Sequence, residues 1–327
     1  MKLKRSWSFG LLLSLTILVV SLSLVYFAIR SLAASRNDEV RQAEVHTEDL
    51  AQALTSQISA EIRQIEMALV TVASELERSL ASGRLDHVRL TRFIGTQEKL
   101  LPNAVAIRVS NADGTVILNN PSADPSANFR DRPFWMHLRD HPEAGLFVSK
   151  PTIGLFTKQW VIHFSRRYNL PDGRFGGVVV APVLVDRFQR TMTGFKVGPA
   201  GRITLRDNEN GFVARYPVVV KGKTLAIGDR EVASELQAIV ASGVQQKTYV
   251  AVTPYDQTKR VFSFQWIQGI PLYVVVSLAE EDFLAQWHQE RREVFIRLGI
   301  SIFGFWLLAA FLGYFLTSPR KTRPRIM

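Results

Sequence analysis

Two uncharged apolar runs near the ends of the chain restrict its architecture most. Residues 9–29 and residues 298–317 contain no Asp, Glu, Lys or Arg. As helices, both runs would be about 30 Å long, which is the thickness of the hydrocarbon core of a bilayer. We therefore predict two transmembrane helices with a folded region between them. A signal peptide cleaved near Ser31-Leu32-Ala33 is the alternative for the first run, but that run is longer than the usual signal-peptide core of about 7–15 residues.

The net charge of +11 is concentrated at the two ends of the chain. Three bases lie within residues 1–8 and four within residues 318–327, whereas the segment from Arg30 to Arg297 contains all 29 acidic residues and has a net charge of only +4. The positive-inside rule therefore predicts cytoplasmic termini and a periplasmic or extracellular main domain, as in a two-pass protein of the bacterial inner membrane. No basic helix or nucleic-acid-binding motif accompanies the charge, so we expect no nucleic-acid partner.

A long helix is predicted directly after the first apolar run. Residues 33–82 contain neither Gly nor Pro, and apolar side chains recur at steps of three and four, which places them along one side of a helix. These side chains are Leu50, Leu54, Ile58, Ile62, Ile65, Leu69, Val72, Leu76 and Leu80. We predict a stalk helix over residues 30–82 that covers the core of the folded region. Whether two such helices pair in a homodimer stays open.

Short strands and turns replace the helical pattern after Gly83 and form two units. The first unit, residues 83–187, has a hairpin with strands at 104–109 and 115–118, a short helical or loop segment at 134–139, and strands at 145–150, 159–168 and 176–185. The second, residues 188–280, has a short helix at 188–193, a hairpin of strands 202–206 and 212–216, a helix at 232–242, and strands at 247–252, 259–265 and 272–277. A charged connecting helix, residues 281–297, leads into the second apolar run. The pattern predicts an α+β fold with mostly antiparallel sheets and an internal repeat in outline.

Cationic and aromatic side chains are concentrated between residues 129 and 174, where we predict a ligand pocket. An arginine close to aromatic rings can offer two parallel donors to a carboxylate beside a surface that excludes water. Several donors around one cavity attract an anion and repel a cation. The candidate ligand-binding residues are Arg132, Phe134, Trp135, Lys150, Trp160, His163 and Arg166. Trp160 and His163 also suit a core, and because Arg166 and Arg167 alternate along a strand, only one of them can face inward.

The sequence offers no catalytic or cofactor motif. It has no cysteine, and only His137 and His141 share the helical spacing of a metal-binding pair, without Glu next to His137 and with Pro142 directly after His141. A nucleophile elbow, a phosphate-binding loop, a dinucleotide fingerprint and a GGDEF-type output segment are also missing from the sequence. We therefore predict a protein that is not an enzyme by itself and uses neither metal nor cofactor.

Four segments of the predicted pocket region carry a resemblance to a known family. They are Asp131-Arg132-Pro133-Phe134-Trp135, Gly145-Leu146-Phe147-Val148-Ser149-Lys150-Pro151, Trp160-Val161-Ile162-His163-Phe164-Ser165-Arg166-Arg167 and Gly173-Arg174-Phe175-Gly176-Gly177-Val178. Together they resemble the double Cache input regions of bacterial diguanylate cyclases and sensor kinases, over residues 30–317. The resemblance implies two PAS-like antiparallel-sheet units on a long N-terminal stalk helix, flanked by two transmembrane helices, with the ligand in the membrane-distal unit.

The same resemblance implies a class of ligand. In the amino-acid-binding branch of that family, an Arg-x-aromatic-aromatic segment holds the ligand carboxylate, and Arg132, Phe134 and Trp135 match it. That branch also uses an aspartate just after the last strand of the distal sheet to bind the amine, whereas this chain has Val180-Ala181-Pro182-Val183 there. The resemblance therefore implies a small carboxylate or another small anion rather than an α-amino acid.

Three functions remain open. The first is a membrane-anchored periplasmic sensor that binds a small anionic ligand in its distal unit and signals across the inner membrane to a separate membrane or cytoplasmic partner. The second is the input half of a diguanylate cyclase or histidine kinase that lacks its output domain, which a catalytic reading frame directly downstream would support. The third is an envelope scaffold without a ligand, for which replacing Arg132 by Ala would leave function unchanged.

Overall fold

The computed structural model describes residues 2–83, 85–101, 106–118, 127–218, 225–253 and 256–317, with side chains from residue 11 to residue 314. It separates into two compact units, one of Met1–Ala43 with Glu281–Met327 and the other of Glu44–Glu280. The helices are α1 (Lys2–Ala81), α2 (His87–Lys99), α3 (Pro133–Asp140), α4 (Val185–Met192), α5 (Ser234–Ser242), α6 (Glu280–Phe283) and α7 (Ala285–Thr317). The strands are β1 (Arg108–Asn111), β2 (Val116–Leu118), β3 (Phe147–Val148), β4 (Thr152–Ile153), β5 (Trp160–Asn169), β6 (Phe175–Leu184), β7 (Arg202–Asp207), β8 (Phe212–Tyr216), β9 (Gln246–Val252), β10 (Lys259–Trp266) and β11 (Leu272–Ala279).

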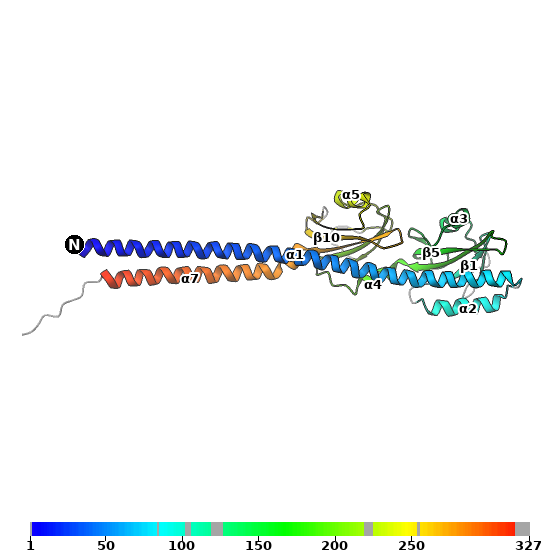
Figure 1. The fold of residues 1–327 in the computed structure, drawn as a ribbon, viewed down its shortest axis with the longest axis horizontal. Coiled ribbons are helices and arrows are strands. Elements are labelled where there is room, and N and C mark those ends of the chain that lie inside the picture. Colours follow the sequence, from blue (N-terminus) through cyan, green and yellow to red (C-terminus); the bar gives the residue numbers. More distant parts are fainter. Residues whose placement is uncertain are drawn as a thin grey trace, which may run out of the picture. The chain divides into compact units, whose positions relative to one another are not determined.

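Helix α1 provides a continuous face for the core of the larger unit. Of the nine apolar residues predicted to lie on one side of it, seven are buried, and Leu50 and Leu80 are half-buried. In the larger unit α1 runs along both sheets, and α2 lies beside it (Figure 1). The predicted amphipathic helix is therefore confirmed, and its contact with two successive sheets explains why the apolar stripe is so long.

The first sheet has the strand order β2-β1-β6-β5-β3, with β4 paired to β5, and its pairings are antiparallel. Helix α3 covers one of its faces, where Phe134, Trp135 and Leu138 pack on Val178 and Val180 of β6. The predicted hairpin is confirmed, although residues 104 and 105 of its first strand lie outside the described residues. The strand predicted at 145–150 is shorter than expected, because only Phe147–Val148 pairs with β5.

Helix α2 has no counterpart among the predicted elements. Asp86 caps its start, since the carboxylate Oδ1 accepts a hydrogen bond from Arg89 N at 3.0 Å. An ion pair of 2.6 Å between Arg89 and Glu75 joins α2 to α1. Its apolar contact with the core is narrow, with only Leu90 and Ile94 buried.

The second sheet repeats the first in outline. Its strand order is β8-β7-β11-β10-β9, and its pairings are again antiparallel. Helix α5 covers one face, where Leu236 packs with Phe264, Tyr273 and Val275. Two antiparallel sheets on one long helix confirm the predicted α+β fold class.

The smaller unit brings the N-terminal part of α1 together with α7. Trp287 is buried in a cluster with Leu32 and Leu284, and its indole Nε1 donates a hydrogen bond to Leu32 O at 3.0 Å. The helix predicted at 281–297 is interrupted, because α6 ends at Phe283 and α7 begins at Ala285.

Both helices of the smaller unit contain a window that is long and apolar enough to cross a membrane. One lies in α1 from Leu11 onward, and the other lies between Ala285 and Tyr314 of α7. Large apolar side chains in these windows, among them Phe27 and Phe303, are exposed rather than packed against protein. The windows therefore differ from the buried core helices that pass the same test of length and composition.

Candidate functional site: a cationic cavity on the first sheet

The start of α3 positions Arg132 over the first sheet. Proline suits the first turn of a helix because no N–H is needed there, and it restricts the residue before it to extended backbone. Arg132 accordingly has φ −88° and ψ 136° and is the N-cap residue, while Pro133 begins the helix. The proline thus fixes where the helix starts and where the side chain of Arg132 leaves the chain.

The register of three strands brings further residues to the face under α3. Arg108 on β1 lies opposite Val180 on β6, and Pro182 on β6 lies opposite His163 on β5. Because side chains alternate between the two faces of a sheet, Val180 and Pro182 share one face of β6. The pairing therefore places Arg108 and His163 on that same face.

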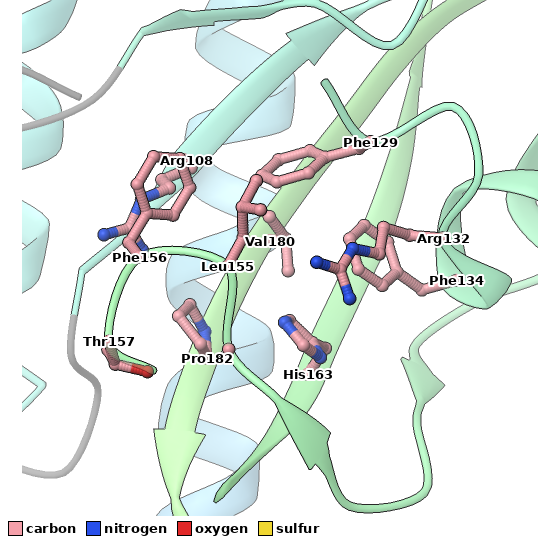
Figure 2. Close-up of a pocket in the computed structure, with 11 residues that line it drawn as sticks. Arg108, Phe129, Arg132, Phe134, Leu155, Phe156, Thr157, His163, Val180 and Pro182 are labelled. Carbon is pink, nitrogen blue, oxygen red and sulfur yellow. The ribbon is translucent and has the colours of Figure 1, made fainter. Parts of the chain in front are cut away.

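These residues enclose a cavity of about 20 Å³, which is enough for a single water molecule. Figure 2 shows Arg108 and Arg132 on opposite sides of it, with His163 and Pro182 on the neighbouring strands. The cavity is lined by Arg108, Phe129, Arg132, Phe134, Gly154, Leu155, Phe156, Thr157, His163, Val180 and Pro182. The two arginines are thus set among mostly apolar walls.

Arg108 is a buried cation that forms no ion pair with a described residue. It is 9% exposed, and its Nε and Nη1 atoms have no hydrogen-bond partner there. Its guanidinium carbon lies 4.1 Å from the centre of the Phe156 ring. Burial lowers the pKa of Arg108, and the charge of Glu98 opposes that shift in part. Because a buried charge that is only partly compensated is costly, an anion in the cavity would stabilise the site.

Arg132 adds a second cation to the same cavity. Its guanidinium forms no hydrogen bond or ion pair with any described residue. No Asp or Glu is among the residues that line the cavity. Two guanidinium groups without a carboxylate produce a field that attracts anions and repels cations.

His163 is held in its neutral form beside these arginines. Its ring stacks on Phe134 with the two centroids 4.9 Å apart, and its Nδ1 lies 3.3 Å from Thr152 Oγ1. Burial, as the largest cause, and the charges of Arg132 and Arg108 together lower the pKa of His163 to about 4. A neutral imidazole carries one N–H donor, which an anion in the cavity could accept.

Of the seven predicted ligand residues, the structure brings Arg132, Phe134 and His163 together in this cavity. Trp135 does not line it but is buried beneath α3, edge to face with Phe175 at 5.4 Å. Trp160, at the start of β5, is 40% exposed and lies away from the cavity as well.

Side chains alternate along β5, so Arg166 and Arg167 point to opposite faces of the sheet. Arg166 turns away from the cavity toward α1, where its Nη1 lies 3.8 Å from the carboxylate of Glu66. Arg167 turns toward α3, where its Nη1 donates a hydrogen bond to Leu138 O at 3.1 Å. Neither arginine lines the cavity, since His163 occupies the position that faces it.

Lys150 lines a larger groove beside the cavity, with a volume of about 630 Å³. Arg132, Phe134 and His163 line both the groove and the cavity, so the two adjoin. The Nζ atom of Lys150 lies 2.5 Å from Glu209 Oε1, in the turn between β7 and β8. The charge of Lys150 is therefore neutralised by the second sheet's turn.

Three prominent cavity residues, Arg108, Phe129 and Phe156, are absent from the predicted set. Arg108 left a signal in the sequence, because it stands between Ile107 and Val109 in an apolar strand, and a charge is rarely buried without a special role. Phe156 comes from the turn between β4 and β5, and no periodic pattern indicates which way such a turn folds.

The chain matches the dCache_1 family model of the Cache domain over residues 32–287. Among solved structures, the extracellular domain of rpHK1S-Z16, described as a histidine kinase, is 21% identical with a TM-score of 0.65, covering 74% of this chain and 96% of that one. The ligand-binding domain of the Pseudomonas fluorescens chemoreceptor CtaA, solved with L-isoleucine, is 14% identical with a TM-score of 0.57, covering 77% of this chain and 98% of that one. The sensory domain of the Campylobacter jejuni chemoreceptor Tlp3, solved with isoleucine, is 11% identical with a TM-score of 0.56, covering 76% of this chain and 97% of that one.

No curated protein shows a significant match to the chain. At such low identities the solved structures support the fold alone, whereas the family model covers most of the chain. The resemblance found in the sequence is therefore confirmed, and the chain belongs to the double Cache family.

Proposed function

We propose that this protein is a membrane-anchored sensor that binds a small anion between Arg108 and Arg132. A sensory role is supported by the relatives, which include the extracellular domain of a kinase and the ligand-binding domains of chemoreceptors. The ligand class rests on one observation, the buried guanidinium of Arg108, whose Nε and Nη1 lack a partner among the described residues. An anion would supply that partner and relieve the cost of the buried charge.

A carboxylate or a comparably small anion fits this cavity better than an α-amino acid does. CtaA and Tlp3 were solved with isoleucine, but an ammonium group needs an acceptor. The described lining has no carboxylate, and β6 presents Val180 and Pro182 there. The volume between Arg108 and Arg132 admits only a water-sized species. A larger anion would have to extend into the adjoining groove or displace the turn at 154–157, where Leu155 and Phe156 close the cavity (Figure 2).

Strand β5 offers a route from the cavity to α1. His163 faces the cavity, and three residues later Arg166 faces Glu66 of α1. At the end of the strand, Asn169 N donates a hydrogen bond to Glu77 Oε1 of α1 at 2.8 Å. A shift of β5 on anion binding would therefore act on α1 at two charged contacts, and α1 continues without a break into the first apolar window.

The proposal includes the topology predicted from the sequence. The apolar windows of α1 and α7 cross the bacterial inner membrane, both termini are cytoplasmic, and the Cache units at 83–187 and 188–280 are periplasmic. The exposed apolar side chains of both windows support this arrangement, because lipid would cover them. The signalling partner is then a membrane or cytoplasmic protein that contacts the helices.

Anion-dependent stabilisation of the full-length protein tests the proposal. Thermal unfolding in detergent micelles would be compared in formate, acetate, nitrate or phosphate and in chloride of equal ionic strength, at neutral pH. A ligand present at a hundredfold excess over its Kd stabilises the folded state by about 2.7 kcal/mol. We expect at least one of these anions to raise the unfolding temperature, and glycine and alanine to have no such effect.

Three arginine variants locate the site. Arg108→Gln and Arg132→Gln should lose the anion-dependent shift, because each removes a charge from the cavity. Arg166→Gln is the matched control and should keep it, since Arg166 lies on the other face of the same sheet. A shift that survives in the Arg108→Gln variant would contradict the assigned site, and a well-folded protein that responds to none of the anions would favour the scaffold function.

A further inference from the structure

The face of the second sheet under α5 carries four arginines. Arg215 on β8 lies opposite Thr204 on β7, and Arg202 and Arg206 share the face of Thr204 because strand side chains alternate. Together with Arg260 on β10, these arginines line a cavity of about 380 Å³. That volume lies within the range of about 300–1,000 Å³ that is usual for small-molecule pockets.

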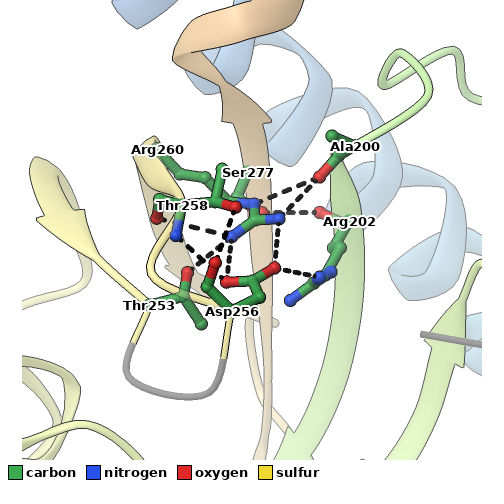
Figure 3. A network of polar contacts seen from close by, with 7 residues as sticks. All are labelled: Ala200, Arg202, Thr253, Asp256, Thr258, Arg260 and Ser277. Atoms are coloured by element: carbon green, nitrogen blue, oxygen red, sulfur yellow. Dashed lines mark hydrogen bonds and ion pairs between the residues drawn. The ribbon is translucent and has the colours of Figure 1, made fainter. Parts of the chain in front are cut away.

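Two of the four arginines share one carboxylate. Arg260 is 1% exposed and donates to both carboxylate oxygens of Asp256, at 3.0 and 2.8 Å. Its guanidinium also donates to the hydroxyl of Thr253 and to two main-chain carbonyls (Figure 3). Arg202 Nη2 donates to the same carboxylate at 2.6 Å. Burial would raise the pKa of Asp256, but hydrogen bonds led by that from Arg260 lower it to about 2. The carboxylate therefore stays ionised and holds both guanidinium groups in place.

The guanidinium of Arg206 is hydrogen-bonded to the main chain. It donates to the carbonyl oxygens of Asn210, Asp229 and Glu231, at 2.5, 3.1 and 3.1 Å. The carboxylate of the neighbouring Asp207 stabilises the turn between β7 and β8, since its Oδ1 accepts hydrogen bonds from Glu209 N and Gly211 N. Arg206 therefore has a structural role at one end of the cavity.

The guanidinium of Arg215, in contrast, forms no hydrogen bond with a described residue. Arg215 is 8% exposed, and its Nε has no hydrogen-bond partner among the described residues. Its Nη groups form no hydrogen bond to a described residue either, so they are the donors it can offer to the cavity. Burial, with the positive charges of Arg202 and Arg206, lowers the pKa of Arg215 to about 10, although the negative charge of Asp229 opposes the shift in part.

Most of the remaining cavity wall is apolar, although Thr204, Glu231, Thr253 and Ser277 also line it. Val232 and Leu236 come from α5 and the residues before it, and Phe262 and Val275 come from β10 and β11. Tyr249 on β9 stacks on Phe262 with the ring centroids 5.2 Å apart. The cavity thus combines a mostly apolar wall with four cations and a single lining carboxylate, that of Glu231, which suits a ligand with an apolar body and a negative group.

We propose that this cavity is a second ligand site, which takes a small organic carboxylate. The carboxylate would pair with Arg215, beside the fixed guanidinium of Arg202, and its apolar body would pack against Leu236 and Tyr249. The site shares no lining residue with the cavity of the first sheet. It is therefore independent of the anion site proposed above and would give the protein two separate inputs.

A binding experiment on the full-length protein tests this second site. The probes are sodium benzoate and sodium butyrate, with sodium chloride of equal ionic strength and the neutral benzamide as controls. We expect benzoate or butyrate to raise the thermal unfolding temperature of the wild type and of Arg108→Gln, and to leave Arg215→Gln unchanged. Benzamide should have no effect, because it cannot neutralise Arg215.

A second measurement needs no ligand. If Arg215 is kept for an anion, its replacement by the similarly long but apolar Met should raise the unfolding temperature in chloride, because a buried charge that Asp229 compensates only in part is removed. Arg206→Met is the contrast and should lower it, because three main-chain carbonyls lose their donor.

The outcomes separate the two proposed sites. A shift with benzoate or butyrate that persists in Arg215→Gln, or one that is lost only in Arg108→Gln, would overturn the second site. No shift with either carboxylate would overturn it too, and so would a lower unfolding temperature of Arg215→Met, which would show that Arg215 is structural. Failure of the first site appears instead as loss of the formate, acetate, nitrate and phosphate response.

Discussion

At the scale of single residues, protonation of His163 links the first cavity to pH. The imidazole is buried, with Arg108 and Arg132 on either side of the cavity and no carboxylate in its lining. The folded state therefore resists protonation of this ring, whereas the unfolded chain takes up a proton at the ordinary pKa of about 6.5. An anion in the cavity would reverse part of that resistance, since it would attract the imidazolium.

The folded protein should consequently lose stability on mild acidification. Because the pKa of His163 is lowered to about 4, the unfolded state binds the extra proton first. Stability is fully present above pH 6.5, falls as the pH decreases from there, and levels off below the folded pKa; the total loss is about 3 kcal/mol by linkage. Thermal unfolding between pH 7 and pH 4 would show this as a steeper fall for the wild type than for His163→Gln, and equal slopes would refute the role of His163.

Some residues of the first cavity could be predicted from the sequence, and others could not. Arg132 and Phe134 belong to one short motif around Pro133, so adjacent positions in the sequence were enough to predict that they lie close together. Arg108 enters only through strand pairing with β6, more than 70 positions away along the chain, and that register is a property of the folded sheet. Trp135 was predicted to contact the ligand because of its position in the motif. Consecutive side chains of a helix are about 100° apart, so Trp135 does not point in the direction of Phe134 and does not line the cavity.

At the scale of elements, Gly177 determines how closely β6 approaches β1. It has a φ of +142°, and a Cβ atom added to it would overlap the main-chain carbonyl of Ser110 on β1. Gly177→Ala should therefore lower the free energy of unfolding by at least about 3 kcal/mol, from backbone strain plus the steric clash. It should also weaken the anion response, because Ser110 lies two residues from Arg108.

Gly173 supplies the control for this prediction. Its φ is +83°, but a Cβ atom there would meet nothing within 4 Å, so Gly173→Ala carries only the strain term of about 1 kcal/mol. Urea unfolding of both variants, followed by tryptophan fluorescence, gives the comparison. Similar losses in the two variants would mean that the close approach of β6 and β1 is not what Gly177 provides.

The predictability of each element follows from the length of its apolar pattern. Helix α1 repeats its apolar step over nine positions, so its existence was clear from the sequence. Helix α2 buries only Leu90 and Ile94 along 13 residues, and one apolar step is too little to stand out from chance. The strand β3 was predicted too long, because strand-like composition continues to Lys150 while only two residues pair with β5.

At the scale of the whole molecule, the absence of native cysteine allows the pairing of α1 and α7 to be tested in membranes. Ser35 Oγ lies 3.4 Å from Glu290 Oε2. A Ser35→Cys, Glu290→Cys variant should therefore form an intramolecular link with a short bifunctional thiol reagent. The control places the second cysteine at Arg292, two residues along α7 and about 200° around the helix. Equal yields for the two variants would show that α7 does not present Glu290 to α1.

The hydrogen bond from Trp287 to Leu32 O has a mechanical consequence for these two helices. If the bond were perpendicular to the axis, a slide of two residues, about 3 Å, would lengthen it from 3.0 Å to about 4.2 Å, which is too long for a hydrogen bond. In the same geometry, a slide of less than about 1.8 Å keeps the bond within 3.5 Å. We therefore expect this hydrogen bond to oppose sliding of α7 along α1 beyond that distance, by about 1 kcal/mol.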